Sequence, residues 1–111
     1  MKKVEAMIKP FTLDAVQEAL VGSGIQGMTI SEVKRVEPRA HPAWYRGAEY
    51  IVWFAPQIKV EVMVADEQVE LCVGAIQRCG KTDDDDSGEI VVLSVEDMIR
   101  IRTGEHLRRA A

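Results

Sequence analysis

Hydrophobic residues follow two different periods along the chain, one typical of strands and one typical of helices. Between Lys3 and Lys9 apolar and polar residues alternate, and the apolar set comprises Val4, Ala6 and Ile8. This period of two predicts a strand with one buried face, and Pro10 ends it. Residues 28–36, 51–64 and 89–93 are rich in β-branched residues, which predicts three further strands, with Pro56 as a break in the second of them.

Two other segments have the spacing of amphipathic helices. We expect Thr12 to cap the first helix, whose apolar face comprises Leu13, Val16 and Leu20. We expect Asp66 to cap the second, whose apolar stripe comprises Val69, Val73 and Ile76. Glycines at positions 22, 24 and 80 end these helices. Residues 94–97 resemble one more helix start, and residues 100–102 follow as a short extended or helical piece.

The resulting order is β-α-β-β-α-β, which predicts the α+β class. Two right-handed crossovers of this kind build a ferredoxin-like sandwich with both helices on one face of a four-stranded sheet. The opposite face presents Met7 and Met63 among charged residues. A solvated face and an oligomer interface are equally compatible with that pattern.

Composition narrows the class of protein. The chain has 111 residues, enough for a single domain, and 47% of them are apolar, enough for a core. A net charge of −4 disfavours nucleic acid as a partner. No apolar run approaches the length of a membrane span, and the first residues lack the apolar stretch of a signal peptide, so we expect a cytoplasmic protein. Cys72 and Cys79 are too far apart on one helix for a disulfide and are expected to fill the core.

Two segments are unusual for a compact domain. The stretch from Glu37 to Glu49 exceeds what a hairpin needs, and its Trp44 and Tyr45 suggest either protein contact or packing onto the body. Four consecutive aspartates at 83–86 indicate a solvated loop or, less specifically, a hard-cation site, so a metal remains an open question.

The C-terminal region concentrates positive charge. Arg100 and Arg102 would project from one side of a strand and could grip a phosphate, although salt bridges to Glu96, Asp97 or Glu105 are an equal alternative. Neither of the two histidines, at 41 and 106, sits in a catalytic or metal-ligand motif. We therefore expect no enzymatic activity.

Four blocks of sequence, at residues 1–11, 27–34, 45–50 and 99–105, resemble the PII signal-transduction proteins. The resemblance covers nearly the whole chain as a single domain, 1–111. It implies the βαββαβ fold and a homotrimer. It also implies a T-loop-like segment at 37–55, a B-loop-like segment at 81–89 and a C-terminal segment at 95–111.

The resemblance further implies an adenine nucleotide bound in clefts between subunits, and no prosthetic group. Residues expected to bind the nucleotide are Gly27, Met28, Thr29, Thr82, Gly88, Arg100 and Arg102. Residues expected to contact or regulate a target protein, such as a transporter or an enzyme, are Trp44, Tyr45, Arg46 and Tyr50. Tyr50 stands in the signature around the family's uridylylation site.

Three departures from the family pattern affect the ligand. Residues 35–40 lack the usual glycines and the glutamine that helps bind magnesium, and Gln57 stands where a lysine contacts 2-oxoglutarate. The B-loop-like segment carries Asp83 to Asp86 and Glu89 in place of glycines and lysines. Added carboxylates repel a triphosphate, so ADP or AMP is expected to bind better than ATP with 2-oxoglutarate.

Two regulatory hypotheses follow from the resemblance. The first is a PII-like regulator that senses adenine nucleotides and bicarbonate, as in the subgroup associated with carboxysomes or bicarbonate transporters. The alternative is a nitrogen-regulatory PII protein that senses ATP and 2-oxoglutarate and is uridylylated at Tyr50. Arginines in and beside the long connection, Arg35 among them, could meet an anion at its base.

Overall fold

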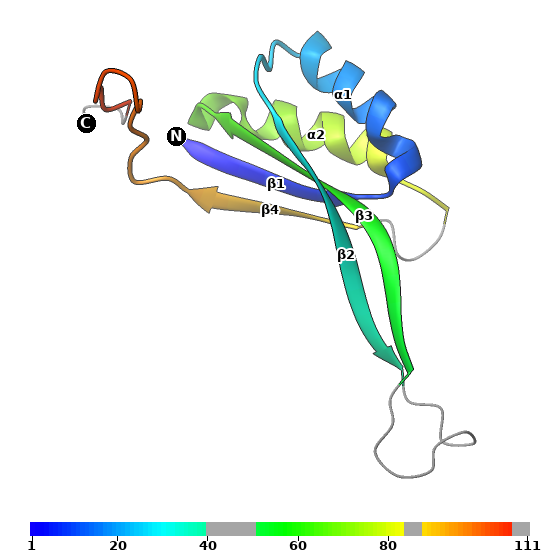
Figure 1. Cartoon of the computed structure of the whole chain (residues 1–111). Helices are drawn as coiled ribbons and strands as arrows, with labels where there is room; N and C mark the ends of the chain where they lie inside the picture. Colours follow the sequence, from blue (N-terminus) through cyan, green and yellow to red (C-terminus); the bar gives the residue numbers. More distant parts are fainter. Residues whose placement is uncertain (40–50, 84–87, 108–111) are drawn as a thin grey trace.

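The computed structural model describes residues 1–39, 51–83 and 88–107. Its four-stranded antiparallel sheet has the order β2-β3-β1-β4 (Figure 1). The strands are β1 (Lys2–Ile8), β2 (Thr29–Arg39), β3 (Ile51–Val64) and β4 (Glu89–Ser94). The helices are α1 (Leu13–Gly22) and α2 (Val69–Gly80), preceded by 3-10 turns at Pro10–Thr12 and Asp66–Gln68. The predicted ferredoxin-like α+β sandwich is therefore confirmed.

Both helices lie on one face of the sheet, which we call the covered face (Figure 1). Over residues 4–8 of β1 and 58–64 of β3, the side chains that point toward the helices are buried, as the alternation of apolar residues predicts. They pack with the apolar stripes of α1 and α2 in one core, which comprises Val4, Ala6, Ile8, Val16, Leu20, Ile25, Ile58, Val60, Val62, Val64, Cys72, Ala75 and Ile76. Cys72 fills this core as a free thiol, and its burial raises its pKa.

The predicted side-chain caps of the two helices are wrong. Thr12 is already in a helical conformation, and its hydroxyl donates to the Lys9 carbonyl at 2.7 Å. The Asp66 carboxylate accepts from the N-terminal ammonium of Met1 at 2.7 Å. Both residues belong to the 3-10 turn that precedes each α-helix. Thr12 stands directly before α1 but forms no side-chain cap, whereas the second turn moves the start of α2 to Val69, past Asp66.

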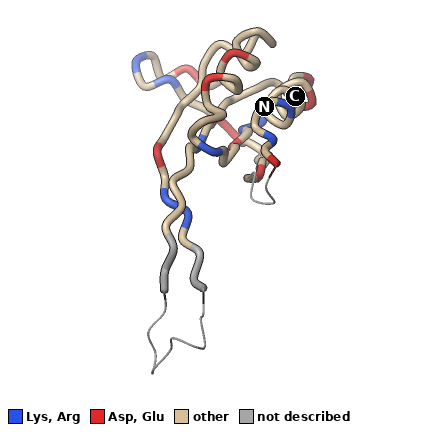
Figure 2. Tube along the Cα trace, turned by 90° about the vertical axis from the view of Figure 1, so that its right-hand side faces the viewer, with Lys and Arg blue, Asp and Glu red and all other residues tan. Residues whose placement is uncertain are grey.

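The strands β2 and β3 continue beyond the sheet as a two-stranded ribbon (Figures 1 and 2). They pair as far as Arg39 with Ile51, whereas β1 pairs with β3 only over 58–64. Pro56 lies in the ribbon opposite Lys34 and does not break the strand, which corrects the prediction. The reason is that β1 has already ended there, so the edge of β3 that faces away from β2 needs no donor from Pro56.

This ribbon shortens the connection that the sequence predicts. Residues 37–39 and 51–55 of the T-loop-like range 37–55 belong to β2 and β3. The remainder of that connection, residues 40–50, lies outside the described residues.

The C-terminal segment is also different from its prediction. No helix begins at 94–97; instead Ile99 pairs with His106 in a small antiparallel hairpin. The Arg100 amide donates to the Glu105 carbonyl at 2.9 Å, and Gly104 turns the chain with a φ of +71°. Arg100 and Arg102 therefore lie in a turn and do not share one face of a strand.

None of the helices in the described part of the chain is long and apolar enough to cross a membrane.

Candidate functional site

The residues expected to bind a nucleotide lie at three separate places in one chain (Figure 1). Residues 27–29 lead into β2, which is one edge of the sheet. Thr82 and Gly88 lie in the segment between α2 and β4, near the opposite edge. Arg100 and Arg102 follow the other end of β4. A single chain therefore does not assemble these residues into one site.

Gly88 has a structural reason to be glycine. Its φ is +109°, a conformation that L side chains rarely adopt. A Cβ at this position would lie 1.8 Å from the carbonyl oxygen of Met7. The chain thus enters β4 by passing directly against β1, and this fixes the backbone at the start of β4.

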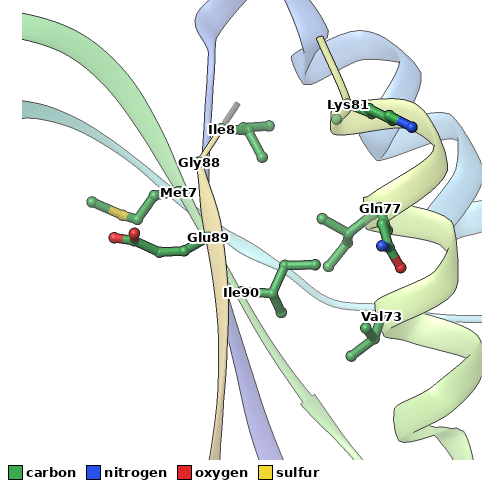
Figure 3. Close-up of a pocket in the computed structure, with 10 residues that line it drawn as sticks. Met7, Ile8, Val73, Gln77, Lys81, Gly88, Glu89 and Ile90 are labelled. Carbon is green, nitrogen blue, oxygen red and sulfur yellow. The ribbon is translucent and has the colours of Figure 1, made fainter. Parts of the chain in front are cut away.

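A groove of about 470 Å³ lies beside this point, between α2 and the strands β1 and β4 (Figure 3). The side chains of Ile8, Ile90 and Val73 form apolar walls, while Gln77 and Lys81 supply the polar groups from α2 and its end. Met7 and Glu89 point away from the helix, to the other side of the sheet (Figure 3). At the start of β4, Ile90 therefore faces the groove and Glu89 faces the other side of the sheet.

An ion pair joins the ribbon to the start of β4 on the open face, the face opposite the helices. Nη1 of Arg35 lies 3.5 Å from both carboxylate oxygens of Glu89. The two residues are 54 positions apart in sequence and belong to opposite edge strands. Opposite charges at 35 and 89 are visible in the sequence, but only the sheet order brings them together.

Gln57 lies between these two charges in the strand register. Its position on β3 falls between Ala55, the partner of Arg35, and Lys59, which pairs with Met7 next to Glu89. The Gln57 side chain is buried, and within the described residues its Oε1 has no hydrogen-bond partner. An unpaired buried amide is costly, so this position is suited to a further polar partner.

The rest of the open face carries a ring of four charges from β1 and β3. Lys3 Nζ contacts Glu5 at 2.9 Å and Glu61 at 3.0 Å, and Lys59 Nζ contacts Glu61 at 3.1 Å. Hydrogen bonds to Glu5 and then to Glu61 raise the pKa of Lys3. Hydrogen bonds from Lys3 and then from Lys59 lower the pKa of Glu61. Both shifts favour the charged forms of Lys3 and Glu61.

The two C-terminal arginines remain available to a ligand. Arg100 and Arg102 are exposed, and over the described parts of the chain neither forms an ion pair with the neighbouring acids. Asp97 instead accepts a hydrogen bond at the His106 ring, with 2.5 Å between Oδ2 and Nδ1. The expected alternative of salt bridges to nearby acids is therefore wrong for this chain by itself.

The structure adds apolar surface that the sequence pattern did not single out. Val36 and Phe54 are exposed opposite each other on the ribbon, and Lys34 Nζ lies 5.8 Å above the Phe54 ring. On β4, both faces carry exposed apolar residues, which are Val91, Val92 and Leu93. An unbroken apolar run on an edge strand is the signal that could have revealed this surface.

The remaining candidates lie outside the described residues. These are Trp44, Tyr45, Arg46 and Tyr50 in the connection, and the last three of the four aspartates at 83–86. Among residues 1–39, 51–83 and 88–107, no group of three or more His, Cys, Asp or Glu residues is arranged to hold a metal ion.

Comparisons with known proteins show that nearly the whole chain matches one family. The family model described as Nitrogen regulatory protein P-II matches residues 1–105. Proteins named Nitrogen regulatory protein P-II from Haemophilus influenzae, Pasteurella multocida and Cereibacter sphaeroides are 53%, 51% and 50% identical to the chain over 106 residues. Each alignment covers 95% of this chain and 95% of the relative. The similarity therefore includes the ribbon, the start of β4 and most of the C-terminal hairpin.

Proposed function

The chain belongs to the family of P-II nitrogen regulatory proteins, and from this premise we propose that it is a homotrimeric regulator that binds adenine nucleotides between its subunits. Proteins of this family are signal transducers and not enzymes, which agrees with the sequence analysis. The regulator would act in the cytoplasm and would control a target protein through the segment at 37–55.

The observation that carries the proposal is the separation of the nucleotide-binding candidates. Residues 27–29, the Thr82–Gly88 region and the arginines at 100 and 102 lie apart in one chain, yet all belong to segments that match the family. A cleft between two copies could bring such groups together. The exposed apolar surface of β4 supports association of copies, because such a surface favours burial.

The nitrogen-regulatory hypothesis is better supported than the bicarbonate hypothesis. All three relatives named above carry nitrogen regulation in their names, and their identity extends over nearly the full chain. No residue of this chain points specifically to bicarbonate. We therefore propose a role in nitrogen regulation, with Tyr50 as the candidate site of uridylylation.

The ligand preference follows from the charges around the start of β4. Glu89 and Asp83 are exposed carboxylates beside the region expected to meet phosphates, and Gln57 carries no charge. Each carboxylate adds repulsion as the number of phosphates increases. We propose that ADP or AMP binds more tightly than ATP with 2-oxoglutarate.

Light scattering and calorimetry test these proposals together. We expect a species of three times 12.4 kDa at micromolar concentration, and a species of 12.4 kDa would contradict the trimer. Titrations with AMP, ADP, ATP, ATP with magnesium and 2-oxoglutarate, and bicarbonate then rank the effectors. Synergy between ATP and 2-oxoglutarate would contradict the proposed preference.

A substitution at Arg102 tests the site itself. Arg102→Ala should weaken ADP binding by about 1.5–3 kcal/mol, because it removes a charge-assisted hydrogen bond to a phosphate. Arg78→Ala is the matched control, because Arg78 is an exposed arginine on α2. Equal affinities for Arg102→Ala and the wild type would remove Arg102 from the site.

Hydrogen exchange tests the regulatory segment. We expect nucleotide to change the exchange of amides in residues 37–55, because a ligand shifts conformers according to its differential affinity for them. The core amides of β1 serve as the internal reference. Full protection of 37–55 without ligand, or no change with any ligand, would contradict a switching role.

A further inference from the structure

The Arg35–Glu89 ion pair is placed where a bound nucleotide would act on it. We propose that a nucleotide phosphate displaces the Glu89 carboxylate from the Arg35 guanidinium, so that the charge of the nucleotide controls whether the ribbon is tied to β4. This inference rests on the proposed binding of adenine nucleotides. It adds two residues, Arg35 and Glu89, that set the discrimination between nucleotides and transmit binding to the ribbon.

The geometry of the pair is that of a weak, exchangeable contact. Both Arg35–Glu89 distances are 3.5 Å, longer than the 2.7–2.9 Å typical of strong charge-assisted bonds. The side chains are 34% and 56% exposed, so water and salt already screen their attraction. A competing anion therefore displaces Glu89 at little cost.

The two partners are held differently by the fold. Glu89 follows Gly88, whose positive φ and close approach to Met7 fix the backbone, and it pairs with Met7 in the sheet. Arg35 lies on the ribbon, where β2 is paired with β3 alone (Figure 1). Loss of the ion pair thus removes a direct link between the ribbon and the far edge of the sheet.

The chemistry of the two groups favours phosphate over carboxylate as the partner of Arg35. A guanidinium presents a planar fork of donors that fits the oxygens of either group, but a terminal phosphate carries more charge. Once Arg35 turns to the phosphate, Glu89 is left as an uncompensated negative charge beside it. That repulsion grows from AMP to ADP to ATP, whereas the Arg35 attraction grows in the same order and opposes it.

Gln57 provides independent support for a ligand at this place. It lies between Arg35 and Glu89 in register, it is 3% exposed, and its Oε1 lacks a hydrogen-bond partner in the described chain. A polar ligand between the two charges would offer this buried amide a partner.

Calorimetry on four full-length proteins tests the displacement of Glu89 by phosphate. These are the wild type, Glu89→Gln, Arg35→Gln and the double variant. We expect Glu89→Gln to tighten ATP binding about five- to tenfold and AMP binding less, because it removes both the competitor and the repulsion. Arg35→Gln should weaken ATP binding, and this loss should be larger when Glu89 is already Gln. In the wild type, the contribution of Arg35 to ATP affinity is reduced, because Arg35 must first give up its ion pair with Glu89.

Two neighbouring residues provide the controls. Glu32→Gln and Lys34→Gln each remove one charge at an exposed position of β2, three residues and one residue before Arg35 and on the other face of the strand, and should leave the ATP and AMP affinities unchanged. Hydrogen exchange of residues 33–36 gives a second readout. Without nucleotide, Glu89→Gln should raise exchange there toward the value that ATP produces in the wild type.

The outcomes separate the inference from the proposed function. If the wild type binds no adenine nucleotide, both fail. The wild type could bind nucleotide while Glu89→Gln leaves the ratio of ATP to AMP affinity unchanged, or while the two substitutions have additive effects on affinity. Either result would overturn the proposed displacement of Glu89 alone.

Discussion

The two faces of the sheet follow the same alternation of residues but differ in their energetics and chemistry. On the covered face, residues 4–8 of β1 and 58–64 of β3 present apolar side chains that are buried against the helices. On the open face, the same strands present the ring around Lys3 and Glu61, and the residues beside it include Gln57 and the Arg35–Glu89 pair. The covered face therefore stabilises the fold, while the open face concentrates the groups that can recognise a ligand or another copy of the chain.

The largest expected effect is on the free energy of unfolding, and it should differ between the two faces at neighbouring positions of β1. Ile8→Ala should lower the free energy of unfolding by about 2–5 kcal/mol, because Ile8 is buried on the covered face against α2. Met7→Ala, on the open face, should cost less than half as much. Denaturant titration at a fixed protein concentration measures both, and equal losses would show that an assembly packs the open face as tightly as the core.

A second substitution tests the point where the chain passes from the segment after α2 into the sheet. Gly88→Ala should destabilise the protein by about 1–3 kcal/mol from its positive φ alone, and contact with the Met7 carbonyl adds to this. Gly22→Ala is the control, because a Cβ there meets nothing within 4 Å. Thermal unfolding that leaves Gly88→Ala as stable as Gly22→Ala would contradict the close approach.

The charge ring of the open face predicts a pH dependence. The pKa of Glu61 is lowered from its ordinary value of 4.5, so its stabilising effect is present above that value and is lost as the pH falls through the lower, folded-state pKa. The Tm of the wild type should exceed that of Glu61→Gln at about pH 7, and the difference should shrink toward about pH 3. A difference that is constant over this range would contradict the ring.

The smallest effect should come from the ion pair on the ribbon. Arg35→Gln should change the free energy of unfolding by less than about 1 kcal/mol, because both side chains are substantially exposed. Denaturant titration would detect a larger loss. A loss comparable to that of Ile8→Ala would mean that Arg35 is a structural residue, in contradiction to its role in exchange.

Much of the fold was predictable because its signals are local. The alternation of residues 3–9 predicted β1 and the side of it that is buried. The spacing of Val16 and Leu20 predicted which side of α1 is buried against the sheet. Neither Thr12 nor Asp66 forms the predicted side-chain cap, although Thr12 does stand at the N-cap of α1. The 3-10 turn before each helix depends on how the chain leaves the preceding strand. Pro56 was wrong as a break, because its tolerance depends on where β1 ends.

The sequence proposes residues for the candidate site but could not give their arrangement. Family motifs predict a nucleotide-binding role for Gly88 and for the arginines at 100 and 102, and motif and spacing could not show that these groups lie apart in one chain. The hairpin that carries both arginines was missed, because residues 94–97 have the composition of a helix start while the turn is closed by hydrogen bonds to residues 104 and 105.

The sequence by itself determined the strands and helices, the covered face and the family, since each depends on periodicity or on residues near one another in the chain. Only the tertiary structure decided that Arg35 meets Glu89, that Gln57 is buried with its Oε1 unpaired in the described chain, and that Gly88 passes against Met7. These contacts depend on the order β2-β3-β1-β4 and on the register of each pair. Such pairings join residues tens of positions apart, and no local pattern of residues specifies their distance or their burial.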